Sequence, residues 1–326
     1  MVSETLVLST PEDLSSKVNF RAGETKLGEQ VQTIASLAEV QDCSARFVLL
    51  GIPEDAGIIA NQGVAGASTA WEPTLKALLN TQSNRFLSGE DLLVLGHFHF
   101  PAIAAEQQND LFSQVSYIDA QVYPILEQLF RAGKVPIVIG GGHNNAYPII
   151  KGLSEAVQEK VHVVNIDAHA DLRPTLGRHS GNGFSYAIQD GYLDHYGVFG
   201  LQQNYLTAYM LDYIQQNSRI VYRFYEDLLL GGEIHDSWLC FLENFPEPLG
   251  LEIDMDAIQN VLSSATSPSG FGVAEIRRIL LSAPRKFAYL HLAEGAVELA
   301  DGRRSPLTAK LIAYLITDFI KGQQTG

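Results

Sequence analysis

Three residues with metal-binding side chains alternate within residues 161–174, which read VHVVNIDAHADLRP. Asp167, His169 and Asp171 follow an apolar run that is typical of a strand buried on both faces. In an extended chain, residues i, i+2 and i+4 point to one side, so these three side chains are expected to project together. A lone Asp or His is usually a structural hydrogen-bonding residue. Buried charges need partners, however, and no basic residue lies inside the triplet, so the pattern favours a metal cation.

Two further apolar runs end in the same kinds of ligand. Residues 249–253 (LGLEI) lead to Asp254 and Asp256, and residues 135–139 (VPIVI) lead through three glycines to His143. Ligands bind at the carboxyl ends of strands in open parallel sheets, so we expect all these side chains to converge there. The predicted ligand set is His143, Asp167, His169, Asp171, Asp254 and Asp256.

The charge of this set indicates two metal ions. Its four aspartates at −1 each and two neutral imidazoles give −4, which two divalent cations would neutralise. Oxygen-rich ligation with some imidazole and no cysteine favours manganese over zinc. Two metals about 3.5 Å apart typically lower the pKa of a shared water and supply hydroxide at neutral pH. The residues therefore predict a dinuclear metallohydrolase.

Strands and helices alternate along the chain. The patterns predict strands at 47–52, 92–95, 135–139, 161–166, 196–199, 219–222, 249–253 and 287–292. They predict helices at about 69–79, 117–132, 206–217, 272–281 and 306–320, with another running from the His143 loop toward residue 153. Residues 1–44 are polar and irregular, with a possible helix near 30–40. We expect one α/β domain with a mostly parallel sheet.

Composition excludes several function classes. The 326 residues carry a formal net charge of −15, which argues against nucleic acid and anionic membrane surfaces as partners. No apolar run reaches the roughly 18 residues of a spanning helix, and no signal peptide is evident. Cys43 and Cys240 form neither a disulfide framework nor a zinc pair. These features predict a cytoplasmic protein with a small-molecule substrate.

The motifs GGGH (140–143), DAHAD (167–171) and EIDMD (252–256) resemble those of the ureohydrolase superfamily of arginase, agmatinase and formimidoylglutamase. The resemblance covers roughly residues 46–320. It implies a three-layer arginase-like fold, with an N-terminal extension at 1–44 and one catalytic domain at 45–326. It also implies two Mn²⁺ ions and a homotrimer or homohexamer.

The same resemblance assigns roles to the ligands. It implies that His143 and Asp171 hold one manganese, that His169 and Asp256 hold the other, and that Asp167 and Asp254 bridge them. Glu294, in HLAEGA, falls where the family places the carboxylate that grips a cationic amidine or guanidinium group. Asp171 and Glu294 are thus expected to serve catalysis. The alternative for Glu294 is a solvated acid of a surface loop.

Several departures from arginases favour the formimidoylglutamase branch. Phe184 follows the Ser-Gly-Asn loop where arginases have a proton-shuttling histidine, so His179 either substitutes or is an ordinary loop histidine. The same loop makes Ser180 and Asn182 expected substrate contacts. Arg173, in DLRP, would bind a substrate carboxylate, or else neutralise nearby aspartates or join a surface salt bridge. The implied reaction converts N-formimidoyl-L-glutamate to L-glutamate and formamide, a step of histidine degradation.

Three other functions compete with this interpretation. Arginase or agmatinase chemistry would use the same attack on a guanidinium substrate. Single-zinc deacetylases share the arginase-like fold and use an Asp-x-His motif, but they do not need Asp171 and Asp256 alongside His143. The non-enzyme alternative is a metal-binding or regulatory protein. Metal content separates the possibilities: two manganese ions, one zinc or none.

Overall fold

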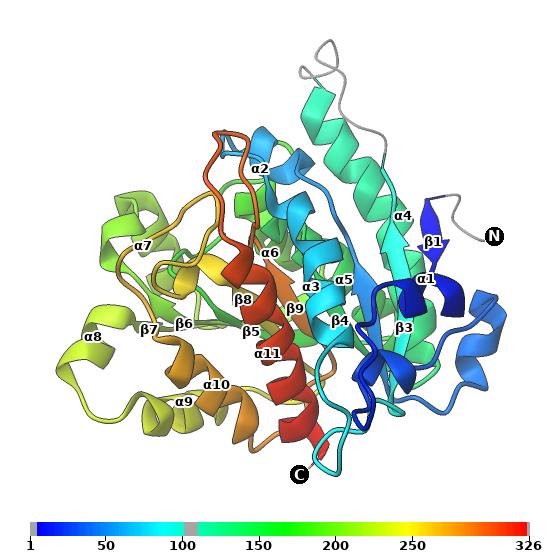
Figure 1. Cartoon of the computed structure of the whole chain (residues 1–326). Helices are drawn as coiled ribbons and strands as arrows, with labels where there is room; N and C mark the ends of the chain where they lie inside the picture. The colour runs from blue at the N-terminus through cyan, green and yellow to red at the C-terminus, as the bar shows by residue number, and fades with distance from the viewer. Residues whose placement is uncertain (1–4, 101–109, 325–326) are drawn as a thin grey trace.

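A nine-stranded sheet organises the protein, with strand order β1-β3-β2-β4-β9-β8-β5-β6-β7 (Figure 1). The computed structural model describes residues 5–100 and 110–324. Strand β1 pairs antiparallel with β3, and every other neighbouring pair is parallel. The strands are β1 Leu6–Leu8, β2 Phe47–Gly51, β3 Leu92–Phe98, β4 Val135–Ile139, β5 Val161–Ile166, β6 Leu193–Leu201, β7 Ile220–Phe224, β8 Leu249–Asp254 and β9 Leu290–Ala293.

The central strands read as continuous apolar runs because both of their faces are buried. In β2, Phe47 and Leu49 pack into one hydrophobic core, while Val48 and Leu50 pack into a second core on the opposite face. Successive side chains of a strand point to opposite faces, so a strand covered on both sides needs apolar residues at every position. The sheet therefore needs a helical layer on each face.

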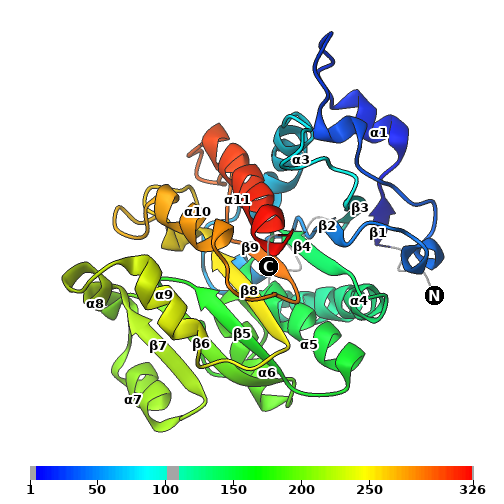
Figure 2. The same cartoon turned by 90° about the horizontal axis from the view of Figure 1, so that it is seen from below.

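Helices supply those two layers (Figure 2). One core is covered by α3 Trp71–Leu79, α8 Tyr225–Leu230, α9 Ile234–Leu242, α10 Val273–Leu281 and α11 Pro306–Gln324. The other core is covered by α2 Ala56–Ala60, α4 Leu111–Arg131, α5 Ala146–Val157, α6 Gly183–Gln189 and α7 Ala208–Gln216. A further helix, α1 Pro11–Ser16, lies near the N-terminus. The predicted three-layer α/β fold is confirmed. None of the helices within the described ranges is both long and apolar enough to cross a membrane.

The N-terminal segment differs most from its prediction. The helix expected near residues 30–40 is absent there; the segment instead forms short 3-10 helices at Leu27–Glu29 and Leu37–Gln41. Between them, the backbone of Gln32 hydrogen-bonds to Leu92 and Val94 of β3, and this pairing excludes a helix. The segment also supplies β1, whose Leu6 pairs with Phe98. The division at residue 44 between extension and domain stays a prediction.

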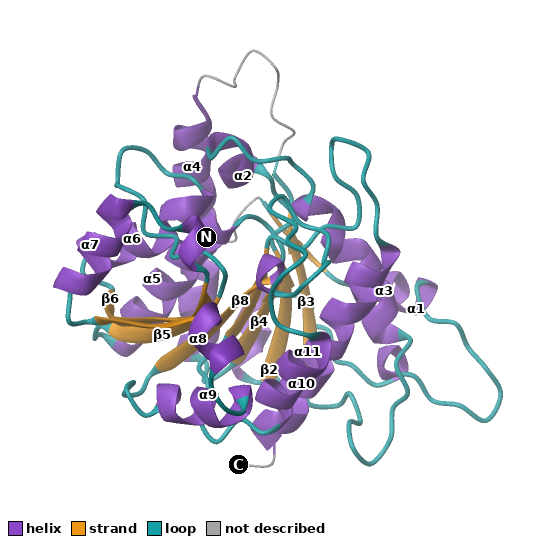
Figure 3. Ribbon diagram, turned by 90° about the vertical axis from the view of Figure 1, so that its left-hand side faces the viewer, coloured by secondary structure: helices purple, strands orange, loops and turns teal. Residues whose placement is uncertain are grey.

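The strand order sets the position of the site. Strands β4, β9, β8 and β5 are consecutive neighbours in the sheet, and each precedes a segment with acidic or imidazole side chains. Loops gather over the carboxyl ends of these strands, at the upper edge of the sheet in Figure 3. Ligand sites of parallel sheets form at this edge. The four loops can thus present their side chains to a common space.

Candidate metal centre

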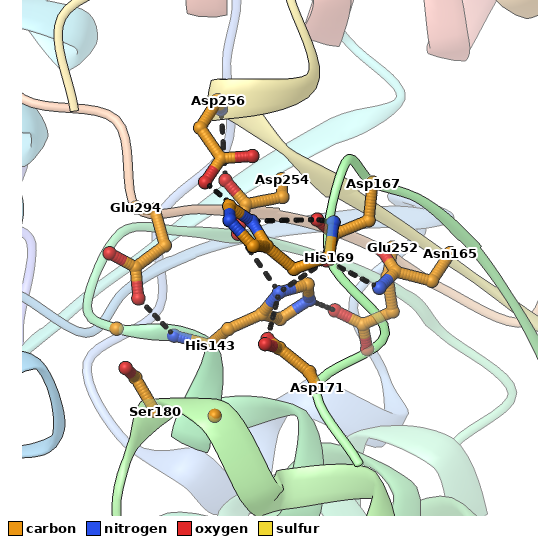
Figure 4. Close-up of polar contacts among 12 residues, drawn as sticks. His143, Asn165, Asp167, His169, Asp171, Ser180, Glu252, Asp254, Asp256 and Glu294 are labelled. Carbon is orange, nitrogen blue, oxygen red and sulfur yellow. Dashed lines mark hydrogen bonds and ion pairs between the residues drawn. The ribbon is translucent and has the colours of Figure 1, made fainter. Parts of the chain in front are cut away.

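Four strand ends deliver the site residues to one place, as Figure 4 shows. His143 begins the segment after the glycine turn that follows β4, and Asp254 is the last residue of β8. Glu294 directly follows β9, while the DAHAD segment directly follows β5. All six predicted ligands lie together, and Glu294 lies beside them.

The first group of ligands surrounds one ring nitrogen. His143 Nδ1 lies 3.1 Å from Asp171 Oδ2, 3.1 Å from Asp254 Oδ2 and 3.4 Å from Asp167 Oδ2. One ligand atom from each of these four residues lies within 4.8 Å of all the others. A ring nitrogen carries at most one proton and cannot satisfy three carboxylates. A cation among the four would satisfy all of them, so the donor set fits a metal.

The second group is built around His169. Its Nδ1 lies 3.2 Å from Asp256 Oδ2 and 3.6 Å from Asp167 Oδ1. Asp167 therefore offers one oxygen to each group, as expected of a bridging ligand. The Oδ1 atom of Asp256 is buried and has no hydrogen-bond partner among the described residues. An orphaned buried carboxylate oxygen costs free energy, and a cation in this group would offset that cost.

Asp254 differs from the expected bridging arrangement. Its Oδ2 belongs to the first group, and its Oδ1 accepts a hydrogen bond of 2.9 Å from the backbone N–H of Asp256, as Asp167 Oδ1 does at 2.7 Å from that of His169. The second group of clustered ligand atoms does not include Asp254. Its side chain is close to both groups, but its geometry differs from that of Asp167.

The backbone is strained at two of these positions. Asp171 has φ of +48° and Glu294 has φ of +64°, in the left-handed region that residues with a Cβ rarely adopt. Such conformations cost about 1–3 kcal/mol each and cluster at functional sites. One expectation is also corrected. The DAHAD segment is not the extended continuation of a strand, because β5 ends at Ile166 and the chain bends within the segment and turns at Asp171.

A buried polar layer behind His143 was not anticipated from the sequence. Glu252 Oε2 lies 3.4 Å from His143 Nε2 and 2.5 Å from His291 Nδ1, while Tyr289 donates to Glu252 Oε1 at 2.7 Å. Carboxylates behind a metal-ligating histidine fix its ring orientation. The sequence feature that could have indicated this layer is Glu252, the one acidic residue within the apolar run 249–253.

The pKa shifts in the centre show that its buried charges are not balanced by the protein alone. Burial lowers the pKa of His169, but the carboxylates of Asp256 and Asp167 outweigh it and raise that pKa to about 12. Burial raises the pKa of Asp256 to about 6, against the opposing pull of His169. Burial and neighbouring carboxylates also hold the pKa values of Asp254 and Glu294 well above their usual range. Shifts of this kind cluster at functional sites.

A cavity of about 220 Å³ opens onto the ligand cluster. Arg173 and Ser180 line it as predicted, and Asn61 donates a hydrogen bond of 3.1 Å from Nδ2 to Ser180 Oγ. The ring of Tyr205 lies 4.5 Å from that of His169. The remaining lining residues include Ile58, Gly63, Met210, Ser264 and Ala265. Asn61 and Tyr205 were missed because their loops have no metal-ligand pattern, although the glycine-rich context of Asn61 was visible.

Two predicted site residues do not line the cavity. The amide of Asn182 holds its own loop: Oδ1 accepts from Arg178 and from the backbone of His179, and Nδ2 donates to Pro174 and Gly177. His179 Nδ1 accepts from the backbone N–H of Gly181. The geometry therefore supports neither a substrate contact for Asn182 nor a catalytic role for His179. Phe184 is buried edge-on against the His143 ring, at 5.2 Å.

Fold and site together define a metal-dependent hydrolase. Residues 45–320 match the Arginase family, and the chain belongs to this family. The protein therefore acts on C–N bonds.

Relatives and solved structures agree with this assignment. The chain is 26% identical over 291 residues to a formimidoylglutamase of Streptococcus pyogenes serotype M12, covering 83% of this chain and 84% of the relative. The crystal structure of Bacillus subtilis formimidoylglutamase shares the fold, with a TM-score of 0.78, 16% identity and coverage of 94% of this chain and 95% of that one. Trypanosoma cruzi formiminoglutamase, solved with Mn²⁺, has a TM-score of 0.71 at 20% identity, covering 92% of this chain and 98% of that one.

Proposed function

We propose that this protein is a dinuclear manganese enzyme that hydrolyses N-formimidoyl-L-glutamate to L-glutamate and formamide. In this proposal His143 and Asp171 would hold one Mn²⁺, His169 and Asp256 would hold the other, Asp167 would be shared between them, and Asp254 would join the first group. The two groups of ligand atoms that share Asp167 support two ions rather than one. When bound, the ions would polarise the substrate and activate a water as nucleophile.

Glu294 is suited to recognise the cationic formimidoyl group. Its side chain lines the cavity, and its Oε1 accepts a hydrogen bond of 3.0 Å from the backbone N–H of His143. This bond fixes the carboxylate beside the first group of ligands. A carboxylate in a cavity with little water interacts strongly with a cation. The solvated-loop alternative fits poorly, because Glu294 is 8% exposed.

The lack of a carboxylate partner for Arg173 is the observation that favours formimidoylglutamate over a guanidinium substrate. Among the ion pairs of the described ranges none involves Arg173, although its side chain lines the cavity. An unpaired arginine matches a substrate that carries two carboxylates and no free α-ammonium. Ser180 accepts from Asn61, so its own hydroxyl proton can be donated to a substrate oxygen. A cationic substrate such as agmatine would be repelled by Arg173.

A substrate panel tests the proposal directly. The manganese-loaded protein is assayed with formimidoylglutamate, arginine, agmatine and guanidinobutyrate, and the bound manganese is counted by elemental analysis. We expect the highest kcat/KM with formimidoylglutamate and two Mn²⁺ per chain. A preference for arginine or agmatine would overturn the substrate while leaving the family unchanged. Three statements stay predictions: that the enzyme acts in histidine degradation, that it is cytoplasmic, and that it forms a homotrimer or homohexamer.

A further inference from the structure

A second cluster of metal-type ligands lies at the other end of the sheet. His162 near the start of β5 faces His195 near the start of β6, with their Nδ1 atoms 3.2 Å apart. Asp194 Oδ2 lies 3.0 Å from His195 Nδ1. One ligand atom from each of the three residues lies within 4.8 Å of the others. The carboxyl-end centre begins at Asp167, five residues of strand beyond His162, or roughly 16 Å at the usual rise.

A β-bulge creates this cluster. Val161 pairs with Leu193 and His162 pairs with His195, so Asp194 is an extra residue in β6. Consecutive residues of a regular strand point to opposite faces. Here the side chains of Asp194 and His195 meet each other and His162 on one side. Bulges re-aim side chains and are frequent next to functional sites.

The spacing of the three atoms suits a tetrahedral cation. Ligands at the usual Zn–N and Zn–O lengths of about 2.0–2.1 Å are about 3.3–3.4 Å apart along a tetrahedral edge. The observed separations of 3.2 Å and 3.0 Å are slightly shorter. Two imidazoles and one carboxylate are a common zinc donor set, with water in the fourth position.

The neighbouring groups orient the side chains of this cluster. The backbone N–H of His195 lies 3.3 Å from His162 Nδ1, so a bound cation would replace this long hydrogen bond. Arg219 binds Asp194 Oδ1 at 2.9 Å, which orients the carboxylate and leaves Oδ2 toward the histidines. The Arg219 side chain is 57% exposed, so solvent screens its charge.

We propose that His162, Asp194 and His195 form a second metal site that takes a borderline divalent cation, with Zn²⁺ the best match. None of these three residues lines the catalytic cavity. By joining β5 to β6 at their amino ends, the cation stabilises the sheet at the edge opposite the reaction. The alternative is a network of hydrogen bonds in which His195 donates to Asp194 and no metal binds.

Zinc uptake by the manganese-loaded protein tests the proposal. Zn²⁺ is added after the catalytic centre is loaded, free metal is removed, and both metals are counted. We expect one additional Zn²⁺ per chain with manganese retained, and an anomalous zinc peak between the two Nδ1 atoms in crystals. His195→Ala should abolish that zinc and any zinc-dependent rise in Tm, while manganese content and kcat stay unchanged. Asp194→Asn serves as a second variant that keeps side-chain size.

His235→Ala is the matched control, because His235 is another partly exposed histidine, bonded to Ser282 away from this cluster. The His235→Ala variant should bind zinc like the wild type. The proposal is overturned if the wild type takes up no additional zinc. It is equally overturned if His195→Ala retains that zinc, or if the zinc peak lies only among the catalytic ligands with loss of manganese.

Discussion

Glu294 is the residue whose charge should matter most for the reaction. Burial and the nearby carboxylate of Asp254 raise its pKa, so its ionised form needs a cation in the cavity. An amidinium substrate provides that cation. Glu294→Gln keeps the size of the side chain and removes the charge, so we expect kcat/KM to fall on the order of 10²-fold or more. Steady-state kinetics measure this, and elemental analysis should give unchanged manganese. Wild-type kinetics in the variant would contradict a role in substrate binding.

Arg173 should decide which substrate is accepted. Arg173→Met keeps much of the apolar stem and removes the guanidinium, so KM for formimidoylglutamate should rise strongly. Loss of a charge-assisted contact corresponds to roughly 1.5–3 kcal/mol, or about 10- to 150-fold. Agmatine has no carboxylate, so its weak turnover should be unchanged or improved. An equal loss with both substrates would show that Arg173 supports the site in general and does not read the carboxylate.

His179 should prove dispensable for catalysis. Burial, then Arg173 and Arg178, lower its pKa to about 4, so it is neutral at pH 7 and lies outside the cavity lining. We expect His179→Gln to retain kcat near the wild-type value. Between pH 6.5 and 4, His179 is protonated in the unfolded chain but not in the folded chain. The contribution of His179 to stability is therefore lost as pH is lowered from 6.5 to 4. The variant should lose part of that pH dependence in unfolding experiments. A large fall in kcat would restore the proton-shuttle hypothesis.

At the scale of elements, Glu54 joins two loops that build the centre. From the loop after β2 it accepts hydrogen bonds from the backbone of Gly142 at 3.1 Å and from the side chains of Asn144 and Asn145 at 3.1 and 2.6 Å. These donors belong to the loop that presents His143. The loop after β2 and the GGGH loop are therefore joined by these hydrogen bonds, although their residues are far apart in the sequence.

Removing this acceptor should loosen the His143 loop. Glu54→Ala leaves several buried donors without a partner, so we expect a loss of about 2–4 kcal/mol in the free energy of unfolding and weaker manganese binding. Glu54→Gln keeps one acceptor oxygen and should cost less. Denaturant unfolding and metal titration measure both effects. Glu243→Ala, at an exposed glutamate, is the control. Equal stability of the Ala and Gln variants would contradict the joining role.

The elements that could be predicted from the sequence are those with a buried apolar pattern. The run 135–139 is the strand β4, and 161–166 is β5, because strands covered on both faces carry an unbroken apolar signal. Strand β1 was missed because it has three residues at the edge of the sheet. Its pairing with β3, like that of Gln32, depends on contacts distant in sequence. Local patterns carry no information about such partners.

For the whole molecule, the sequence predicted which metal-type residues would cluster but not the residues around them. The alternation in DAHAD and EIDMD identified metal-type residues, because charged side chains directly after buried strands need a partner. The adjacency of β4, β9, β8 and β5 comes from the strand order, which no local pattern contains. For the same reason the layer of Glu252 and His291 could not be predicted. That Asn61 lines the cavity and His179 does not depends on loop conformations that only the folded chain defines.

The metal should also stabilise the whole molecule, and its removal provides the clearest global test. Without a cation, the buried cluster holds carboxylates with raised pKa values, including Asp256 at about 6. At Asp256 the folded, metal-free chain therefore binds a proton at pH values where the unfolded chain, whose aspartates titrate near 3.9, does not. The contribution of this carboxyl to stability is present at low pH and is lost as pH rises through about 6. Metal binding requires deprotonated ligands, so the affinity for manganese changes in the opposite direction and rises with pH.

These opposite signs give a specific prediction for chelation. The fall in Tm caused by EDTA should be small near pH 5 and should grow steadily toward pH 8, as the metal-free form weakens and the manganese form strengthens. Thermal unfolding with and without excess Mn²⁺ at each pH measures the difference. Asp256→Asn and Asp171→Asn each remove one ligand charge, so they should bind manganese weakly, retain almost no turnover and show a smaller chelation effect. A chelation effect that does not change with pH would contradict the buried carboxylates as the metal ligands.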